Sequence, residues 1–125
     1  MTFKQIQDDV IQKYRITICS NSTCWSRMHA HVRERKVCKW FPKSSAHCTF
    51  ELLHEIGHIE NNSGKMRRCE EEFYATQWAA DRCREYGVVI PEKTKKAYED
   101  YIDRELDRGK RRGGSNYPKS LTVKW

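Results

Sequence analysis

The stretch CTFELLHEIGH, residues 48–58, decides how the rest of the chain is interpreted. Its apolar residues recur at helical spacing, which predicts a helix that begins after Ser44–Ser45 and continues to about Glu60. Within this helix His54 and His58 are four residues apart, so both imidazoles project from one face and can bind a single metal ion. The spacing therefore predicts a zinc site built on a helix.

Glu55 follows the first histidine and completes an H-E-x-x-H pattern. A carboxylate at this position can take a proton from zinc-activated water and deliver it to a leaving amine, which is the chemistry of peptide hydrolysis. With the His and Glu content of this chain, roughly 0.02 accidental matches to the pattern are expected, so chance explains it poorly. The alternative is that His54 and His58 are ordinary helix residues that make hydrogen bonds.

A catalytic zinc ion needs a third protein ligand, and the next predicted helix offers one. The sequence Asn61–Gly64 is typical of a turn, and apolar residues at helical spacing predict a helix over about 65–86 that ends at Gly87. Three adjacent glutamates, Glu70–Glu72, lie early in this helix. If the turn folds the two helices antiparallel, a glutamate in this position returns to the level of His58.

Helix geometry distinguishes the three glutamates. Relative to Cys69 on the apolar stripe, Glu72 falls about 60° away on the side that flanks this stripe, whereas Glu70 falls about 100° away on the other side and Glu71 about 160° away. Glu72 is therefore the predicted ligand and Glu70 the reserve. For Glu71 we expect a place in a solvated acidic patch near the helix amino terminus.

These residues resemble a known family. The run Cys48–His58 resembles the active-site helix of the ImmA/IrrE metallopeptidases, and Glu72–Ala75 resembles the E-x-x-A pattern of gluzincins. The segment Ala75–Ala79 is similar to that family's Ala-Asn-x-Phe-Ala segment, and the likeness covers roughly residues 1 to 90. It implies a small zincin-like fold and a setting in phages or mobile elements, where some members cleave repressors or other regulators. The site that the resemblance implies has the zinc ligands His54, His58 and Glu72 and the catalytic acid/base Glu55.

Two features depart from the family pattern. The separation of 14 residues between His58 and Glu72 is shorter than in many members, and Thr76 replaces the usual Asn. The short separation predicts a compact helical hairpin beside an open cleft. No residue stands out as the second electrophile that would stabilise an oxyanion opposite the metal. Three histidines are candidates, although each is more simply an ordinary strand or loop residue: His29, His31 and His47.

The remaining sequence predicts a small α+β domain. An amphipathic helix is expected over residues 2–14, followed by two or three short strands between residues 15 and 41. The second and third strands, within 28–32 and 37–41, are expected to form a hairpin that turns near Glu34–Arg35. A fourth helix is expected from Pro91 to Gly109. These elements divide the chain into a single domain (1–109, with core 1–90 and an added helix 91–109) and a basic flexible tail (110–125).

Composition limits the remaining possibilities. The chain has 125 residues, a formal charge of +7 and 38% hydrophobic content, which is enough for one modest core. It contains no run of about 20 apolar residues, and its amino terminus lacks the features of a signal peptide, so the expected location is the cytoplasm. The six cysteines are expected as thiols there, with Cys69 and Cys83 packed in the core. The closest pair, Cys19 and Cys24, is a poor match to a structural zinc site.

The function predicted from these features is that of a zinc-dependent metalloendopeptidase, with Glu55 activating the zinc-bound water. The expected partner is a protein or peptide, in extended form along the edge of the sheet, at the strand that ends near Trp40. One alternative is a zinc-containing regulatory or inhibitory protein of a mobile element without turnover. Another is association with nucleic acid through the basic tail, for which a solvated tail is the simpler explanation.

Overall fold

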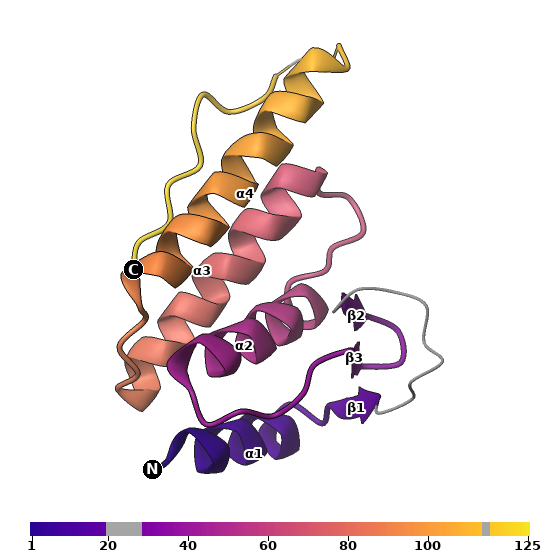
Figure 1. The fold of residues 1–125 in the computed structure, drawn as a ribbon. Coiled ribbons are helices and arrows are strands. Elements are labelled where there is room, and N and C mark those ends of the chain that lie inside the picture. Colours follow the sequence, from indigo (N-terminus) through magenta and orange to yellow (C-terminus); the bar gives the residue numbers. More distant parts are fainter. Residues whose placement is uncertain (20–28, 114–115) are drawn as a thin grey trace.

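A computed structural model describes residues 1–19, 29–113 and 116–125, and it shows the expected α+β domain (Figure 1). In this part of the chain four helices accompany one three-stranded sheet. None of these helices is both long enough and apolar enough to cross a membrane. The elements are α1 (Phe3–Lys13), β1 (Thr17–Cys19), β2 (His29–His31), β3 (Lys36–Cys38), α2 (Ala46–Glu60), α3 (Arg68–Tyr86) and α4 (Glu92–Arg111).

Local capping fixes most helix ends close to their predicted positions. The Ser45 hydroxyl accepts a hydrogen bond from the Cys48 amide at 3.1 Å and so begins α2 where the sequence predicts. Gly87 ends α3 in the left-handed conformation, with φ of 71°, which glycine adopts without strain. The largest difference is at the start of α3, which begins at Arg68 rather than at residue 65. Helix α4 ends at Arg111, two residues later than predicted. It continues through Gly109 because one glycine within a helix lowers its stability by only about 1 kcal/mol.

The sheet has the strand order β1-β3-β2. Strands β2 and β3 pair antiparallel across a turn in which Arg35 has a φ of 50°, so the expected hairpin is confirmed. Strand β1 pairs parallel to β3 on the other side, with Thr17 opposite Lys36. Strand β3 is therefore the central strand, and β2 is an outer strand, with no further strand paired to its other edge in the described part of the chain.

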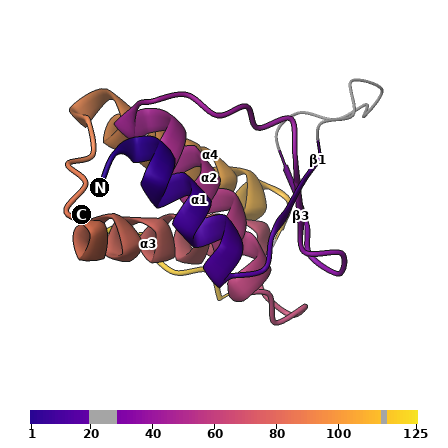
Figure 2. The same ribbon diagram turned by 90° about the horizontal axis from the view of Figure 1, so that it is seen from below.

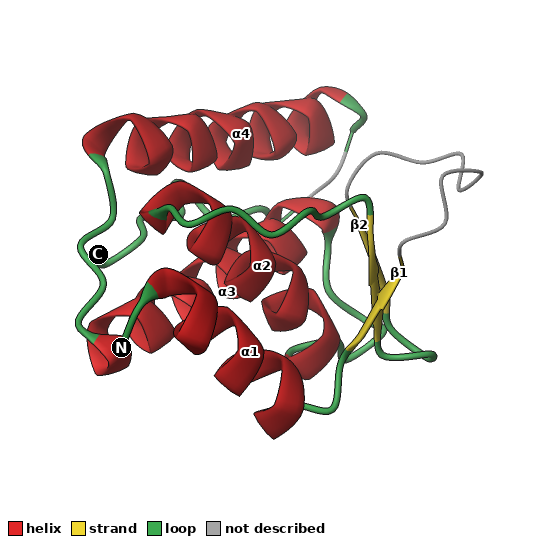
Figure 3. Cartoon of the chain, turned by 60° about the horizontal axis from the view of Figure 1, so that its bottom comes forward, coloured by secondary structure: helices red, strands yellow, loops and turns green. Residues whose placement is uncertain are grey.

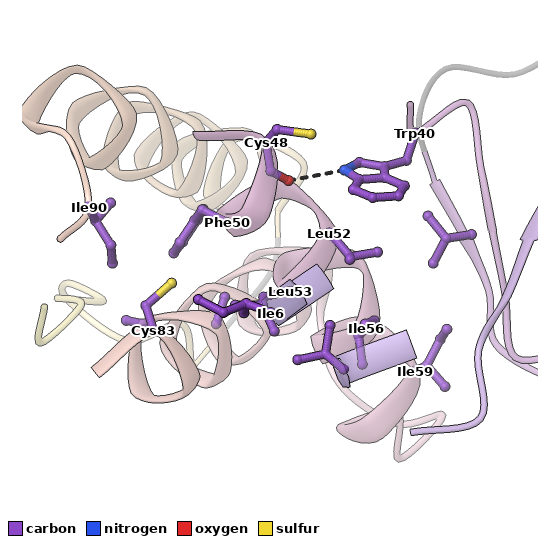
Figure 4. Close-up of a cluster of buried hydrophobic side chains, with 14 of the residues drawn as sticks. Ile6, Trp40, Cys48, Phe50, Leu52, Leu53, Ile56, Ile59, Cys83 and Ile90 are labelled. Atoms are coloured by element: carbon purple, nitrogen blue, oxygen red, sulfur yellow. Dashed lines mark hydrogen bonds between the residues drawn. The ribbon is translucent and has the colours of Figure 1, made fainter. Parts of the chain in front are cut away.

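Helix α2 lies at the centre of the fold, between α1, α3 and the sheet (Figures 2 and 3). Its residues Phe50, Leu53 and Ile56 are fully buried in the main hydrophobic cluster. Figure 4 shows this cluster, in which the Trp40 indole N–H donates a hydrogen bond to the Cys48 carbonyl at 3.0 Å. The expected burial of Cys69 and Cys83 in the interior is confirmed. Burial on several sides holds α2 rigidly, which is what a metal-binding helix requires.

The two helices that carry the predicted ligands approach each other closely at Gly57 of α2. A Cβ atom added to Gly57 would lie 2.7 Å from the Ala75 carbonyl oxygen and 3.0 Å from the Ala75 Cα of α3. Only glycine fits against this backbone. Because His54 and His58 flank Gly57 in sequence, the close approach also sets how near they come to α3.

We expect the substitution Gly57→Ala to destabilise the protein by about 1–3 kcal/mol, because overpacking would push α2 and α3 apart. In a helix with space for the methyl group, the same change would stabilise the folded protein by up to about 1 kcal/mol. A tight and a loose contact between α2 and α3 therefore predict changes of opposite sign. Urea unfolding of the metal-free protein measures the change in the free energy of unfolding. A gain in stability would show that α2 and α3 can move apart at Gly57 at little cost in free energy.

The carboxyl-terminal segment, residues 116–125, differs from the flexible tail that the sequence predicts. Val123 is buried in the core cluster, and the Trp125 indole N–H donates a hydrogen bond to Glu99 of α4 at 2.9 Å. The side chain of Gln77 in α3 makes two hydrogen bonds to the backbone of Lys124. In Figure 1 this segment, drawn in yellow, runs back along α3 and α4. Val123 and Trp125 anchor the segment to the core, although its basic residues are typical of a solvated tail.

Candidate metal centre

Three predicted ligands meet between α2 and α3. The Nε2 atom of His54 lies 3.0 Å from Oε2 of Glu72 and 3.1 Å from Nε2 of His58. The third side of this triangle, from His58 Nε2 to Glu72 Oε2, is 3.3 Å. The two histidines come from successive turns of α2, and Glu72 comes from the second turn of α3. The antiparallel helices thus bring together residues that are 14 or more positions apart in sequence.

This triangle has the size that a small metal ion requires. Metal–ligand distances of about 2.0–2.2 Å place neighbouring donor atoms of a tetrahedral site about 3.3–3.6 Å apart. The three observed separations, 3.0 to 3.3 Å, match or lie slightly below this range. Among the residues that the structure describes, His54, His58 and Glu72 form the one group of three ligand atoms close enough to hold a metal ion.

Burial and mutual contact set the charges of this group. His54 and Glu72 are only 4% and 3% exposed. Burial lowers the pKa of His54, which favours the neutral imidazole that binds metals. For Glu72, burial by itself would raise the pKa, but the contacts with His54 and His58 outweigh it and hold the pKa well below its usual value. The contact with Glu72 also outweighs the burial of His58, whose pKa is raised.

Glu55 lies beside this group without belonging to it. It is 9% exposed and lines the same cavity as the three ligands. Burial of the carboxyl group raises the pKa of Glu55 to about 7, and this effect exceeds the opposing influence of His58. A carboxyl group beside the ligand triangle and open to a cavity has the position of a proton-transfer residue.

Thr76 supports the centre from behind. Its hydroxyl donates a hydrogen bond to the Glu72 carbonyl at 2.7 Å, and its oxygen lies 3.1 Å from Nδ1 of His54. Since the hydroxyl proton is directed to the carbonyl, the oxygen accepts a hydrogen bond from His54 Nδ1–H. This arrangement favours the tautomer whose free lone pair is on Nε2, directed at the other two ligands. Thr76 thus places a hydrogen-bond acceptor behind the first predicted ligand.

We expect Thr76→Val to weaken zinc binding about 10–100-fold, because the buried Nδ1–H of His54 loses its acceptor and the ring loses its fixed orientation. The variant Thr76→Ser keeps the hydroxyl and should bind zinc nearly as tightly as the wild type. Competition with a chromogenic chelator measures both affinities. If the two variants were equally weak, packing of the methyl group, and not the hydrogen bond, would be the cause.

The second oxygen of Glu72 also has a partner. Arg68, one turn earlier in α3, places Nη2 3.3 Å from Glu72 Oε1, and the same nitrogen donates to the Tyr101 hydroxyl at 3.3 Å. Glu72 therefore presents Oε2 to the histidines while Arg68 engages Oε1. Helix α4, which carries Tyr101, is in this way connected to the ligand group.

A cavity of about 610 Å³ lies in front of the ligand group. Strand β2 and the residue after it border the cavity through Ala30 and Val32, and α4 borders it through Ala97, Tyr98 and Tyr101. The added helix therefore forms part of the wall of the cleft that was expected to be open. The residues that line the cavity are Ala30, Val32, His47, His54, Glu55, His58, Asn61, Asn62, Met66, Arg68, Glu71, Glu72, Ala97, Tyr98 and Tyr101.

Tyr98 is a further residue of the site that was not expected from the sequence. Its ring packs against that of His54, with the centroids 4.8 Å apart, and its hydroxyl makes no hydrogen bond within the described part of the chain. Burial raises the pKa of Tyr98, so the phenol stays protonated and can donate a hydrogen bond. Its helical spacing with Ile102 indicated only an amphipathic helix, and no local signal in the sequence relates α4 to the metal site.

The other candidates have separate positions. His47 lines the cavity, but it contacts Thr94 through Nδ1 at 2.7 Å and Glu51 through Nε2 at 3.1 Å. His29 and His31 are in β2. Glu70 lies 4.0 Å from Arg67 and is not part of the ligand group. Cys24 and the predicted strand residue Met28 lie outside the described residues.

Comparisons with known proteins do not identify the chain. No protein-family model, curated protein or solved structure matches it. What the site can do must therefore be inferred from its own residues. These establish a buried group of two histidines and one glutamate that can hold a metal ion, with a second glutamate beside it in an accessible cavity.

Proposed function

We propose that the protein is a zinc-dependent metallopeptidase that hydrolyses a peptide bond in a protein or peptide substrate. The observation that carries this proposal is the triangle of His54, His58 and Glu72 with Glu55 next to it on the same cavity. The proposal includes the family resemblance to the ImmA/IrrE metallopeptidases and a cytoplasmic location, both of which rest on the sequence alone.

Zinc is the proposed metal because of the donor set. Two neutral imidazoles and one carboxylate, with an open fourth position, are typical of catalytic zinc sites. When bound, zinc supplies a Lewis acid that polarises the scissile carbonyl and lowers the pKa of water. Oxygen-rich sites suit calcium and magnesium better, and His54 and His58 provide nitrogen in two of the three positions.

The protein's own residues carry the proton transfers. Glu55 takes a proton from the attacking water and passes it to the leaving amine, which completes hydrolysis without any other acid or base. Tyr98 lines the same cavity from α4, and its hydroxyl, which has no hydrogen-bond partner among the described residues, can donate a hydrogen bond to the developing oxyanion. Thr76 and Arg68 keep His54 and Glu72 in place during the reaction.

The proposed substrate path follows β2. The expected strand near Trp40 is wrong for this role, because β3 pairs with a strand on each side and offers no free edge. Strand β2 is an outer strand, and Ala30 borders the cavity from it. An extended peptide can add to this edge through backbone hydrogen bonds and pass between β2 and α4.

The test is cleavage of a diverse peptide library by the zinc-loaded protein, with products identified by mass spectrometry. Cleavage by the wild type and its loss in Glu55→Gln would support the proposal. Binding of peptides without any cleavage by the wild type would instead favour a regulatory zinc protein without turnover.

A further inference from the structure

Beyond peptide hydrolysis, we propose that the carboxyl-terminal half of α4, together with the start of α3, binds the phosphodiester backbone of a nucleic acid beside the metal cavity. From sequence alone, this role is expected for the basic tail, residues 110–125. The structure joins Arg111 and Arg112 of that tail to Arg104 and Arg108 of α4, while the last residues of the chain pack against α3 and α4.

The arginines of the last turns of α4 and Arg112 at its C-cap lie on one face. At about 100° per residue, Arg104, Arg111 and Arg112 all fall within about 60° of Arg108, whereas the nearby acids Asp103 and Asp107 fall about 100° or more away. All four arginines are exposed. The helix therefore presents a stripe of guanidinium groups, with Asp103 and Asp107 on another side and the buried Glu105 at its edge, about 60° from Arg108. We call these four residues the arginine stripe.

The stripe borders a small hollow that can accept a phosphate. A cavity of about 120 Å³ is lined by Arg68, Arg108 and Arg112, together with Glu105 and Tyr117. Glu105 is 8% exposed and accepts a hydrogen bond from Arg108 at 3.1 Å. Arg108 pairs with Glu105, and Arg68 pairs with Glu72 of the ligand group. The excess of positive charge at this concave site therefore comes from Arg112 and the rest of the stripe. Planar guanidinium groups bind phosphate oxygens through paired hydrogen bonds.

The same face of α4 connects this hollow with the metal cavity. Tyr101 lines the metal cavity and falls about 20° from Arg108 on the helix. Arg68 lines both cavities and donates to the Tyr101 hydroxyl. A polyanion that follows the stripe therefore reaches the rim of the site where we propose that peptides are cleaved.

The chain end reinforces this surface. The Arg67 guanidinium lies 4.2 Å from the centre of the Tyr117 ring and donates a hydrogen bond to the Asn116 carbonyl at 2.8 Å.

The surroundings of the arginine stripe favour a nucleic acid over a lipid surface as its partner. The large hydrophobic side chains that are exposed in the described part of the chain lie outside α4, whereas a membrane-surface helix needs an apolar face to insert. These side chains are Met1, Phe41, Tyr74 and Val89.

The experiment compares two charge-matched double variants of the full chain. Arg104→Gln with Arg112→Gln removes two charges from the stripe, and Lys93→Gln with Lys96→Gln removes two from the other end of α4. Fluorescence anisotropy measures binding to a labelled DNA duplex and to its single strand over a series of salt concentrations. For the wild type we expect log K to fall linearly with log salt concentration.

In the stripe variant the slope of log K against log salt concentration for the duplex should become less negative by about 1.8. Two phosphate contacts are lost, and each contributes about 0.9 to the slope. The lysine variant should keep a slope close to that of the wild type. Equal losses in the two variants, or no binding by the wild type, would overturn the proposal. So would binding of the wild type to phosphatidylserine vesicles but not to DNA. Because peptide cleavage is not part of the measurement, failure of the proposed peptidase function would not change its interpretation.

Discussion

Purified protein supplied with zinc should contain about one zinc ion per chain, and Glu72→Ala should lose most of it, because two histidines alone leave the site one protein ligand short. Inductively coupled plasma mass spectrometry measures the zinc content after extensive dialysis. The control is Glu70→Ala, which removes the same side chain two residues earlier in α3. Glu70 lies outside the ligand group, so this variant should keep its zinc.

The same pair of variants should differ in thermal stability. A ligand that binds only the folded state stabilises it by about 4 kcal/mol when present at a thousand times its dissociation constant. Added zinc should therefore raise the melting temperature of the wild type and of Glu70→Ala by several degrees, and that of Glu72→Ala by much less. Melting of the metal-free variants checks that each one folds.

Two results of the zinc measurement would contradict the proposed site. Full zinc content in Glu72→Ala would exclude Glu72 as a ligand, and a wild type that takes up no zinc would exclude the metal centre.

Glu55→Gln should keep the zinc and lower the rate of peptide hydrolysis by about 10²–10⁴-fold, because the amide has the shape of the carboxylate but cannot accept a proton. Glu55 is not one of the three ligands, so zinc content separates loss of chemistry from loss of the metal. The effect should fall on kcat, with KM little changed, since the step removed belongs to the transition state.

The matched control is Glu51→Gln, one turn earlier on α2. Glu51 pairs with His47 and lies outside the ligand group, so its amide variant should cleave at close to the wild-type rate. If Glu55→Gln cleaved as fast as the wild type, another group would have to move the proton. If both variants lost activity equally, the cause would be a general change in the charge of α2 and not the role of Glu55.

The group that can hold a metal ion could be predicted from sequence to an unusual extent because its parts are local. His54 and His58 share a face of α2 through their spacing alone. Glu72 was distinguished from Glu70 by its angle on α3, and its burial in the structure agrees with that angle. The position of Glu72 opposite the histidines needed only a short turn, which leaves two helices few ways to pack other than antiparallel.

Elements that depend on long-range packing could not be predicted in the same way. The order of the three strands determines which edge is free, and no residue of β2 or β3 encodes that order locally. The carboxyl-terminal segment looked like a solvated tail because its basic residues are easily recognised. Val123 and Trp125 bury it against the helices, but a single apolar residue has no periodicity that would reveal this.

The sequence by itself thus determined the α+β class, the helix that carries the two histidines and the angle of Glu72, since helical periodicity fixes which side chains share a face. Only the tertiary structure decided that Tyr98 packs on His54, that Thr76 supports the same ring and that α4 walls the cavity. These contacts join residues 22 or more positions apart in sequence, and their geometry depends on how closely the helices approach. At Gly57 the absence of a side chain sets that approach, because the Ala75 backbone occupies the space that a Cβ atom would need.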